Sequence, residues 1–324
     1  MSDTSPWKTG LLASGLPLES EVAALLVGAG FRVDTDFKFR RPEGEATGES
    51  SVPLRARAAA PLSDPERAAA SVDLLFECRH RDPQTAWLFL PEVNEPSRSP
   101  VVKGNTIRVV DKFSPYAMDP SATAGFDVQM PICRKGLEIE AGHGNVCRRE
   151  PDGGLEQLQY VLPRLLIEAI SSHLGGPPGK NAPFMFCPIL LTTARLLVAD
   201  KGMSAESVER AVGLEELAEE VPCLIAHRDF GPDFASFCRQ EFRVLEGLES
   251  HDGTLIVERK RAGHFRSDAE LPVAIIESLI AGRPEWLQRF FTQFVVCTAS
   301  KLPALIESIR RAVDAAVETR KGLP

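Results

Sequence analysis

Apolar positions near the start of the chain recur at helical spacing. Between residues 16 and 28 they fall three or four positions apart, which predicts an amphipathic helix. Gly28 and Gly30 follow the last apolar position and are typical of a helix end. Glu19 and Glu21 lie in the first turn, where a carboxylate interacts favourably with the helix dipole. The apolar positions are Leu18, Val22, Leu25 and Leu26.

The pattern then changes to strict alternation, which is typical of half-buried strands. Residues 31–39 and 51–57 follow it, with a polar loop predicted between them at residues 40–49. Pro53 indicates that the second of these strands has an edge position or a bulge. In the first strand we expect Phe31, Val33, Phe37 and Phe39 on one face, and Arg32, Asp34, Asp36 and Lys38 on the other.

A third alternating segment, residues 71–79, carries charges on one face. Asp73, Glu77 and Arg79 alternate with apolar residues that we expect to point inward. Burying an unpaired charge inside a protein costs free energy, so this face is either open to water or its charges have a functional role. The inward residues are Val72, Leu74, Phe76 and Cys78, and a further strand is predicted at residues 85–91.

Helices and strands continue to alternate in the rest of the chain. Residues 94–150 are rich in proline, glycine and serine and are predicted to be mostly loop. Two glycines open a helix at residues 153–176, which we expect to be interrupted or kinked near Pro163. Further strands are predicted at 184–200 (with a turn), 222–230, 253–260 and 291–299, and further helices at 205–220, 271–282 and 302–322. This order predicts an α/β fold with a mixed sheet.

Composition narrows the class of protein. The 324 residues carry a net charge of −8, which argues against a surface coated in positive charge for sequence-independent DNA binding. A local basic groove is compatible with the arginines Arg55, Arg57, Arg67, Arg79 and Arg81, although a solvated charged face is the alternative. No apolar run reaches the roughly 18 residues of a membrane span, and the N-terminus has no signal-peptide pattern. We therefore expect a cytoplasmic protein without a membrane partner.

The seven cysteines do not form a CxxC pair, so a structural zinc site is not expected. Several lie in apolar runs, where a free cysteine behaves as a small hydrophobic residue. The six histidines show no ligand spacing, and the sequence motifs of dinucleotide, phosphate-loop, zinc-protease and serine-hydrolase sites are missing.

The order of the segments resembles that of the restriction-endonuclease-like, or PD-(D/E)XK, nuclease superfamily. "PLESEVAALLVGAGF" resembles its first helix, "SSVPLRA" the strand with the metal-binding Asp, "LLFECRHR" the Glu-x-Lys strand, and "EQLQY" the Gln/Tyr helix. The resemblance covers about residues 15–200. It implies a restriction-endonuclease-like core over residues 1–200, with a central mixed sheet flanked by helices, which a C-terminal α/β region at 201–324 packs on or extends.

The resemblance also implies hydrolysis of a nucleic-acid phosphodiester with Mg²⁺ or Mn²⁺. Carried over residue by residue, it makes Glu77 a metal ligand and Glu19 a ligand through water. Gln157 and Tyr160, which share a helix face, would hold the site or the substrate backbone. Arg79 stands in the Lys position and keeps the positive charge, but an arginine essentially never gives up its proton.

One ligand position departs from the superfamily pattern. Pro53 stands where the metal-binding Asp is expected, and proline has no side-chain oxygen. Asp36, on the preceding strand, is the candidate replacement. The implied catalytic set is therefore Glu77, Arg79, Gln157 and Tyr160, and the implied metal ligands are Glu77, Glu19 and Asp36.

Three interpretations remain open. The chain is a metal-dependent nuclease with rearranged carboxylates, or a nuclease fold without catalysis that binds nucleic acid or protein, or an α/β protein with a solvated strand face. In the first, Glu77 and Arg79 line a concave pocket with Glu19 and Gln157 nearby. In the second, Arg79 pairs directly with Glu77 or Asp73 and fills the place of the metal. In the third there is no pocket.

Overall fold

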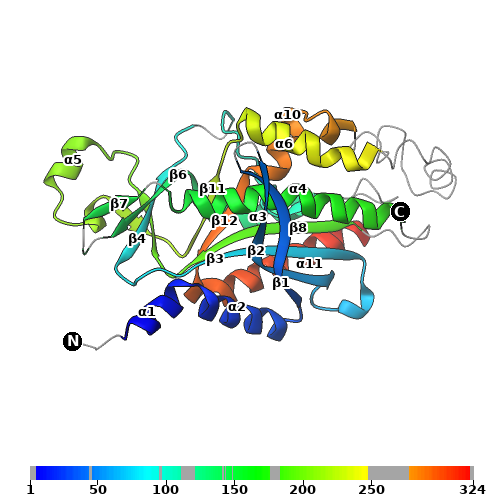
Figure 1. The fold of residues 1–324 in the computed structure, drawn as a ribbon, viewed down its shortest axis with the longest axis horizontal. Coiled ribbons are helices and arrows are strands. Elements are labelled where there is room, and N and C mark those ends of the chain that lie inside the picture. Colours follow the sequence, from blue (N-terminus) through cyan, green and yellow to red (C-terminus); the bar gives the residue numbers. More distant parts are fainter. Residues whose placement is uncertain are drawn as a thin grey trace.

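The computed structural model describes residues 5–43, 46–94, 97–110, 121–140, 142, 144–147, 149–175, 183–246 and 277–321 (Figure 1). The predicted strand at 253–260 and the first half of the predicted helix at 271–282, residues 271–276, lie outside these residues. The helices are α1 (Pro6–Ala13), α2 (Leu16–Gly28), α3 (Ser121–Val128), α4 (Asp152–Gly175), α5 (Ala205–Arg210), α6 (Pro232–Phe242), α10 (Pro284–Phe291) and α11 (Leu302–Lys321). The strands are β1 (Arg32–Glu43), β2 (Ala46–Ala60), β3 (Ala70–Arg79), β4 (Thr85–Pro91), β5 (Arg108–Val110), β6 (Ile132–Glu140), β7 (Asn145–Cys147), β8 (Phe184–Thr192), β9 (Arg195–Ala199), β10 (Ala218–Glu220), β11 (Cys223–His227) and β12 (Gln293–Thr298).

The strands form one mixed sheet, as the sequence predicts. Its order is β1-β2-β3-β8-β12-β11-β6-β4-β9-β10, with β5 paired to β8 and β7 paired to β6. An antiparallel meander of β1, β2 and β3 is followed by β8 and β12, which run parallel to β3. Strands β11 and β12 come from the predicted C-terminal region, yet they pair with β6 and β8 inside this sheet.

Helices cover both faces of the sheet (Figure 1). One core lies between the sheet and α4, α6 and α10, and a second lies between the sheet and α2, α3 and α11. Alternate residues of β3 serve the two cores: Leu75 packs into the first, and Leu74 and Phe76 pack into the second. The predicted spacing in α2 is confirmed, since Leu18 and Val22 are buried on the second core.

None of the described helices is by itself long and apolar enough to cross a membrane. Helices α1 and α2 meet that test of length and composition only when they are taken together as a pair bent by 51°.

Three predicted stretches are wrong. The loop at 40–49 belongs to the β1–β2 hairpin, in which Arg40 pairs with Glu49. Residues 94–150 contain the nine-residue strand β6. The alternation of apolar and polar residues in β6 is broken because the charged Glu138 occupies a buried position, where it accepts a hydrogen bond from the Trp87 indole at 2.8 Å. The helix at 205–220 is short, since it ends at Arg210 and an extended Gly213 follows. Helix α4 runs through Pro163 without interruption, so the predicted interruption is wrong as well.

The first strand changes face at Asp36, contrary to the predicted alternation. Phe31 packs into the α2–α11 core, whereas Phe39 packs into the α4 core. Asp36 has a φ of +53°, and this left-handed conformation reverses which side the following residues present. Pro53 lies opposite, and β2 changes face there too, since Val52 and Leu54 belong to different cores. The hairpin thereby crosses α4 (Figure 1).

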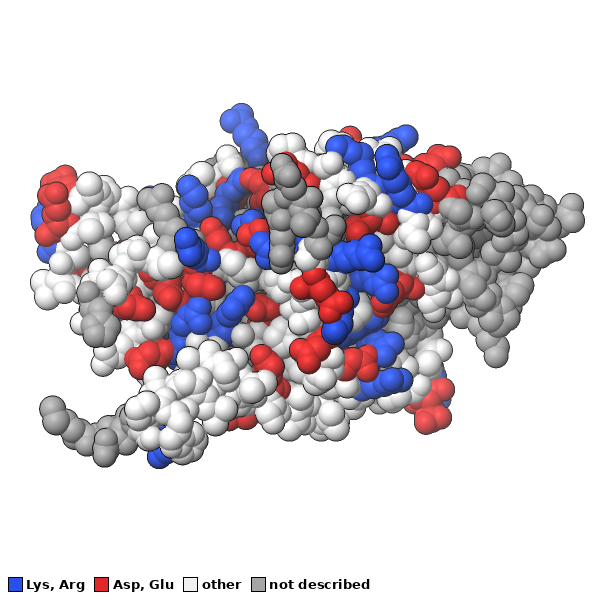
Figure 2. Space-filling model, viewed as in Figure 1, with Lys and Arg blue, Asp and Glu red and all other residues white. Residues whose placement is uncertain are grey.

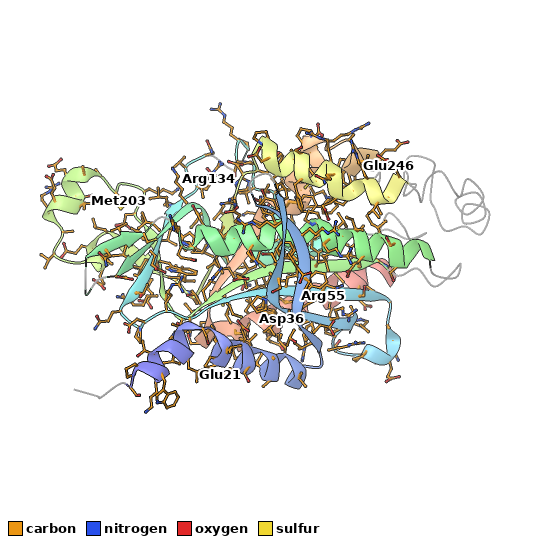
Figure 3. The ribbon with its side chains drawn as sticks, in the orientation of Figure 1. Glu21, Asp36, Arg55, Arg134, Met203 and Glu246 are labelled. Atoms are coloured by element: carbon orange, nitrogen blue, oxygen red, sulfur yellow. The ribbon has the colours of Figure 1, made fainter. Side chains whose placement is uncertain are left out.

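The charged face of β3 is not open to water, so the interpretation as a solvated face is wrong. Asp73 is only 7% exposed and Glu77 only 4%. Asp73 accepts a hydrogen bond from Arg55 Nε at 2.7 Å, and Arg55 Nη1 donates to Glu168 of α4 at 2.8 Å. Arg55 also lies over the Phe37 ring, 4.6 Å from its centroid. Figure 3 marks Arg55 and Asp36 on the hairpin. This ion triad ties β2, β3 and α4 together.

Replacing Arg55 by Ala is expected to lower the free energy of unfolding by about 3–5 kcal/mol, because the buried carboxylate of Asp73 loses its charge partner. Arg32→Ala is the matched control. Arg32 lies on the neighbouring strand with its side chain 78% exposed, and it pairs with Asp34 at 3.5 Å. We expect its loss to change stability by no more than about 0.5 kcal/mol. Urea unfolding at pH 7 measures both, and equal effects would contradict a structural role for the triad.

Candidate functional site

Asp36, Pro53 and Glu77 lie in one row across three neighbouring strands. The pairs Thr35–Leu54 and Phe37–Val52 flank Asp36 and Pro53. The β2–β3 ladder ends at the pair Leu54–Phe76, one residue before Pro53 and Glu77. Proline has no N–H group, so Pro53 cannot donate the backbone hydrogen bond that would extend the ladder by another pair.

Helix α2 begins beside the part of β3 that lies beyond the end of this ladder. Gly15 caps α2 with a φ of +80°, a conformation that favours glycine. A Cβ on Gly15 would lie 3.3 Å from Glu19 Oε1 and 3.8 Å from the Cys78 carbonyl oxygen. The first turn of α2 therefore brings the Glu19 carboxylate to the edge of β3, next to Glu77.

Glu77 and Arg79 form an ion pair. Glu77 Oε1 lies 3.0 Å from Arg79 Nη2. The other carboxylate oxygen, Oε2, is buried without a hydrogen-bond partner in the described structure, and so is Arg79 Nε. A half-satisfied buried carboxylate is a costly arrangement, because the lost hydration of one oxygen is not replaced.

Burial raises the pKa of Glu77 to about 7. Arg79 opposes this increase, whereas the carboxylates of Glu150 and Glu19 add to it. The pKa of Glu19 is itself raised by burial and by Asp36. The site thus combines several mutually repelling carboxyl groups, and the guanidinium of Arg79 opposes their effect on Glu77.

Gln157 and Tyr160 have different surroundings although they lie one turn apart on α4. The Gln157 amide donates to the Ser51 carbonyl oxygen at 2.6 Å and accepts from Arg41 at 3.3 Å. It therefore fastens α4 to β2 two residues before Pro53. Tyr160 packs on Phe234 and Phe237 of α6, with ring centroids 5.2 and 5.0 Å apart. The structure thus brings Glu77, Arg79 and Glu19 together, with Gln157 at the adjoining strand, and directs Tyr160 to α6.

Two residues at the start of α4 belong to the site but were not predicted. A Cβ on Gly154 would lie 2.6 Å from Leu190 Cδ1 of β8, which is too close, and 3.5 Å from Glu77 Cγ, which is an ordinary contact, so the glycine lets α4 pack closely on Leu190 beside Glu77. The pair of glycines that opens the helix was the available signal. Glu150 lies 3.5 Å from Arg81 and has a buried Oε2 without a hydrogen-bond partner in the described structure. Nothing in the pattern around Glu150 marks it.

These residues do not fit a Mg²⁺ or Mn²⁺ site in this arrangement. In the described part of the chain, no three His, Cys, Asp or Glu side chains are grouped so that they could hold a metal ion. Asp36 is exposed, and two strand spacings, about 9.5 Å, separate its row position from that of Glu77. Mg²⁺ needs oxygen ligands at about 2.1 Å. Pro53 offers none, and Arg79 occupies one oxygen of Glu77.

Comparison of the chain with protein-family models, with curated proteins and with solved structures gives no match. The interpretation of the site therefore depends on its own geometry.

Replacing Glu77 by Gln is expected to stabilise the protein increasingly as the pH rises. The unfolded carboxyl ionises near pH 4.3 and the folded one near pH 7, so the wild type loses stability between these values. The variant should gain about 2–3 kcal/mol over the wild type between pH 5 and pH 8. Urea unfolding at both pH values measures the difference.

Glu49→Gln provides the control for this experiment, because Glu49 lies on β2 with its side chain 68% exposed. A Glu77→Gln effect that stays constant between pH 5 and pH 8, as for this control, would contradict the raised pKa.

Proposed function

We propose that this chain is a nuclease-like protein that binds a partner without metal-dependent cleavage. The contact between Arg79 and Glu77 carries the proposal, because a guanidinium takes the position in which the resemblance to the PD-(D/E)XK superfamily requires a metal ion. The permanent charge of Arg79 neutralises Glu77 but cannot generate a hydroxide nucleophile. Pro53 removes the second ligand from the same row.

The arrangement of elements supports the nuclease-like part of the proposal. Helix α2 precedes the β1–β2–β3 meander. The elements β4, β5, α3, β6 and β7 come next along the chain, and α4 then crosses to β8, which runs parallel to β3. The helix, three strands and Gln-bearing helix on which the resemblance rests thus occur in that order, with these five elements between β3 and α4. Gln157 lies on the crossover helix and bonds to the strand that carries Pro53.

The charges near the site favour a protein over nucleic acid as the partner. Nucleic-acid binding depends on cations that are free to neutralise phosphates. Here Arg41 pairs with Glu156 at 2.7 Å and Lys38 pairs with Glu49 at 2.7 Å. Basic and acidic side chains are interspersed over this face of the molecule (Figure 2).

Exposed apolar side chains also favour a protein partner. Helix α1 buries none of its residues. Its Trp7 is 65% exposed, and Leu11, Leu12 and the adjacent Leu16 are exposed as well. Aromatic and large aliphatic side chains of this kind are typical of the central part of protein–protein interfaces.

Calorimetric titration of Mg²⁺ and Mn²⁺ tests the loss of the metal site. We expect no binding to the wild type and stoichiometric binding to Pro53→Asp/Arg79→Lys, which restores the superfamily's carboxylate pair and lysine. Adding Glu77→Gln to that double variant should abolish the binding. Thermal unfolding confirms that each variant is folded. Binding to the wild type that is lost in Glu77→Gln, or metal-dependent cleavage of DNA or RNA by the wild type, would instead support an active nuclease.

Fluorescence anisotropy with DNA and RNA oligonucleotides at low salt tests the class of partner. We expect dissociation constants of about 10⁻⁴ M or weaker, the weak end of non-specific binding. Tighter binding that weakens steeply with added salt would identify nucleic acid as the partner.

A further inference from the structure

Cys223 and Cys297 face each other across the neighbouring antiparallel strands β11 and β12. The two residues are direct partners in the strand register, and their Sγ atoms lie 2.8 Å apart. Cys297 is completely buried in the core beneath α11, whereas Cys223 is partly exposed. The two thiols therefore touch, and only one of them is accessible from outside.

The backbone places this pair where a disulfide bond fits. The Thr298 N–H donates to the Pro222 carbonyl oxygen at 3.0 Å, so these two residues form the hydrogen-bonded pair of the ladder. Cys223 and Cys297, one position further in, form the adjacent non-hydrogen-bonded pair, in which Cα atoms are about 4.5 Å apart. That separation lies within the range of disulfides, so a bond can form without movement of either strand.

A cavity of about 700 Å³ opens on Cys223, the accessible member of this pair. Its volume is within the range of small-ligand pockets. The lining includes Cys223, Phe126, Met130 and Leu305, together with Lys201 and Lys301. Asp200 and Glu219 line the cavity as well, so it presents two carboxylates beside the two ammonium groups. Apolar walls with charged groups of both signs suit a peptide-sized ligand that itself carries carboxylates and ammonium groups.

The two thiols differ in their readiness to ionise. The contact with Cys297 and the ammonium of Lys301 lower the pKa of Cys223, against the effect of burial. Contact with Cys223 and burial raise the pKa of Cys297. Elsewhere, burial raises the pKa of the thiols of Cys133 and Cys187 to about 12, as expected for cysteines that serve only in packing. Cys223 is also the thiol that lines the cavity, whereas Cys297 is buried, so Cys223 is the nucleophile of the pair.

We propose that Cys223 and Cys297 form a thiol–disulfide exchange site that reduces a small peptide disulfide of the oxidised-glutathione type, which carries both carboxylates and ammonium groups, held in this cavity. The Cys223 thiolate attacks one sulfur of the ligand, which forms a mixed disulfide and releases one thiolate. Cys297 then loses its proton and attacks Cys223 Sγ, which forms the Cys223–Cys297 bond and releases the second thiolate. Two protein thiols are oxidised, one ligand disulfide is reduced to two thiols, and the protein protons pass to the two leaving groups. This activity is independent of the function proposed for the Glu77 site.

Thiol counting on the full chain tests the proposal. The protein is equilibrated with oxidised glutathione, denatured, alkylated and analysed by mass spectrometry. We expect two of the seven thiols to be lost and a peptide cross-linked between Cys223 and Cys297 to appear. Cys297→Ser should retain one glutathione on Cys223, because the resolving thiol is missing, and Cys223→Ser should give neither product. Cys147→Ser, which replaces another partly exposed cysteine, should behave as the wild type.

Two results would overturn the proposal. One is that all seven thiols of the folded wild type remain free to alkylation after equilibration. The other is that the loss of thiols persists unchanged in Cys223→Ser, which would show that other cysteines react.

Discussion

A proline cannot donate a backbone hydrogen bond, and the arrangement of the first three strands depends on this property of Pro53. On one side of it, β2 and β3 are paired from Leu54–Phe76 to Ala60–Ala70 and are fastened to α4 by the Arg55 triad. On the other side, the first turn of α2 lies against β3. The residues beyond the last rung, Glu77 and Arg79, therefore share their surroundings with two helices as well as with β8. The candidate site therefore forms where the β2–β3 ladder ends.

The two buried carboxylates of β3 differ in how the free-energy cost of burying their charge is offset. Asp73 is paired with Arg55, which also pairs with Glu168, so the carboxylate and the guanidinium both have partners. Glu77 has one ion pair and one oxygen without a partner among the described residues, and burial raises its pKa to about 7 in spite of the ion pair with Arg79. The paired arrangement at Asp73 stabilises the fold, whereas the half-paired arrangement at Glu77 leaves part of the cost of burial uncompensated. Such a position is where a protein most readily exchanges a proton or accepts a ligand.

Sequence predicts an element well when apolar residues recur along it at a regular period or form an unbroken run. The helix α2 and the strands β3 and β4 have such patterns, and their predicted and observed limits agree closely. Strand β6 was missed because Glu138 is a charge at a buried position, and the change of face in β1 was missed because a positive φ at Asp36 leaves no trace in the pattern. Helix α1 has no buried residue and hence no periodic signal that burial would impose.

The candidate site was predictable only in part, for a related reason. Glu77 and Arg79 stood out because their alternation placed them on one face of a strand, whereas Glu19 was included only because the resemblance to the PD-(D/E)XK superfamily implied it. Glu150 lies in a connection, where no period exists. The contact between Cys223 and Cys297 depends on the register of two strands that are separated by some seventy residues, and no local pattern encodes such a register.

The position of β12 has a consequence for how the chain is made. It is the last described strand along the sequence, yet it lies between β8 and β11 and is nearly at the middle of the sheet. Until β12 emerges from the ribosome, the apolar edges of both neighbours have no partner to pair with. Unpaired strand edges in a partly made protein are prone to aggregation. Synthesis of this chain therefore passes through a stage in which the centre of its sheet is open, and a chaperone that covers strand edges would act at that stage.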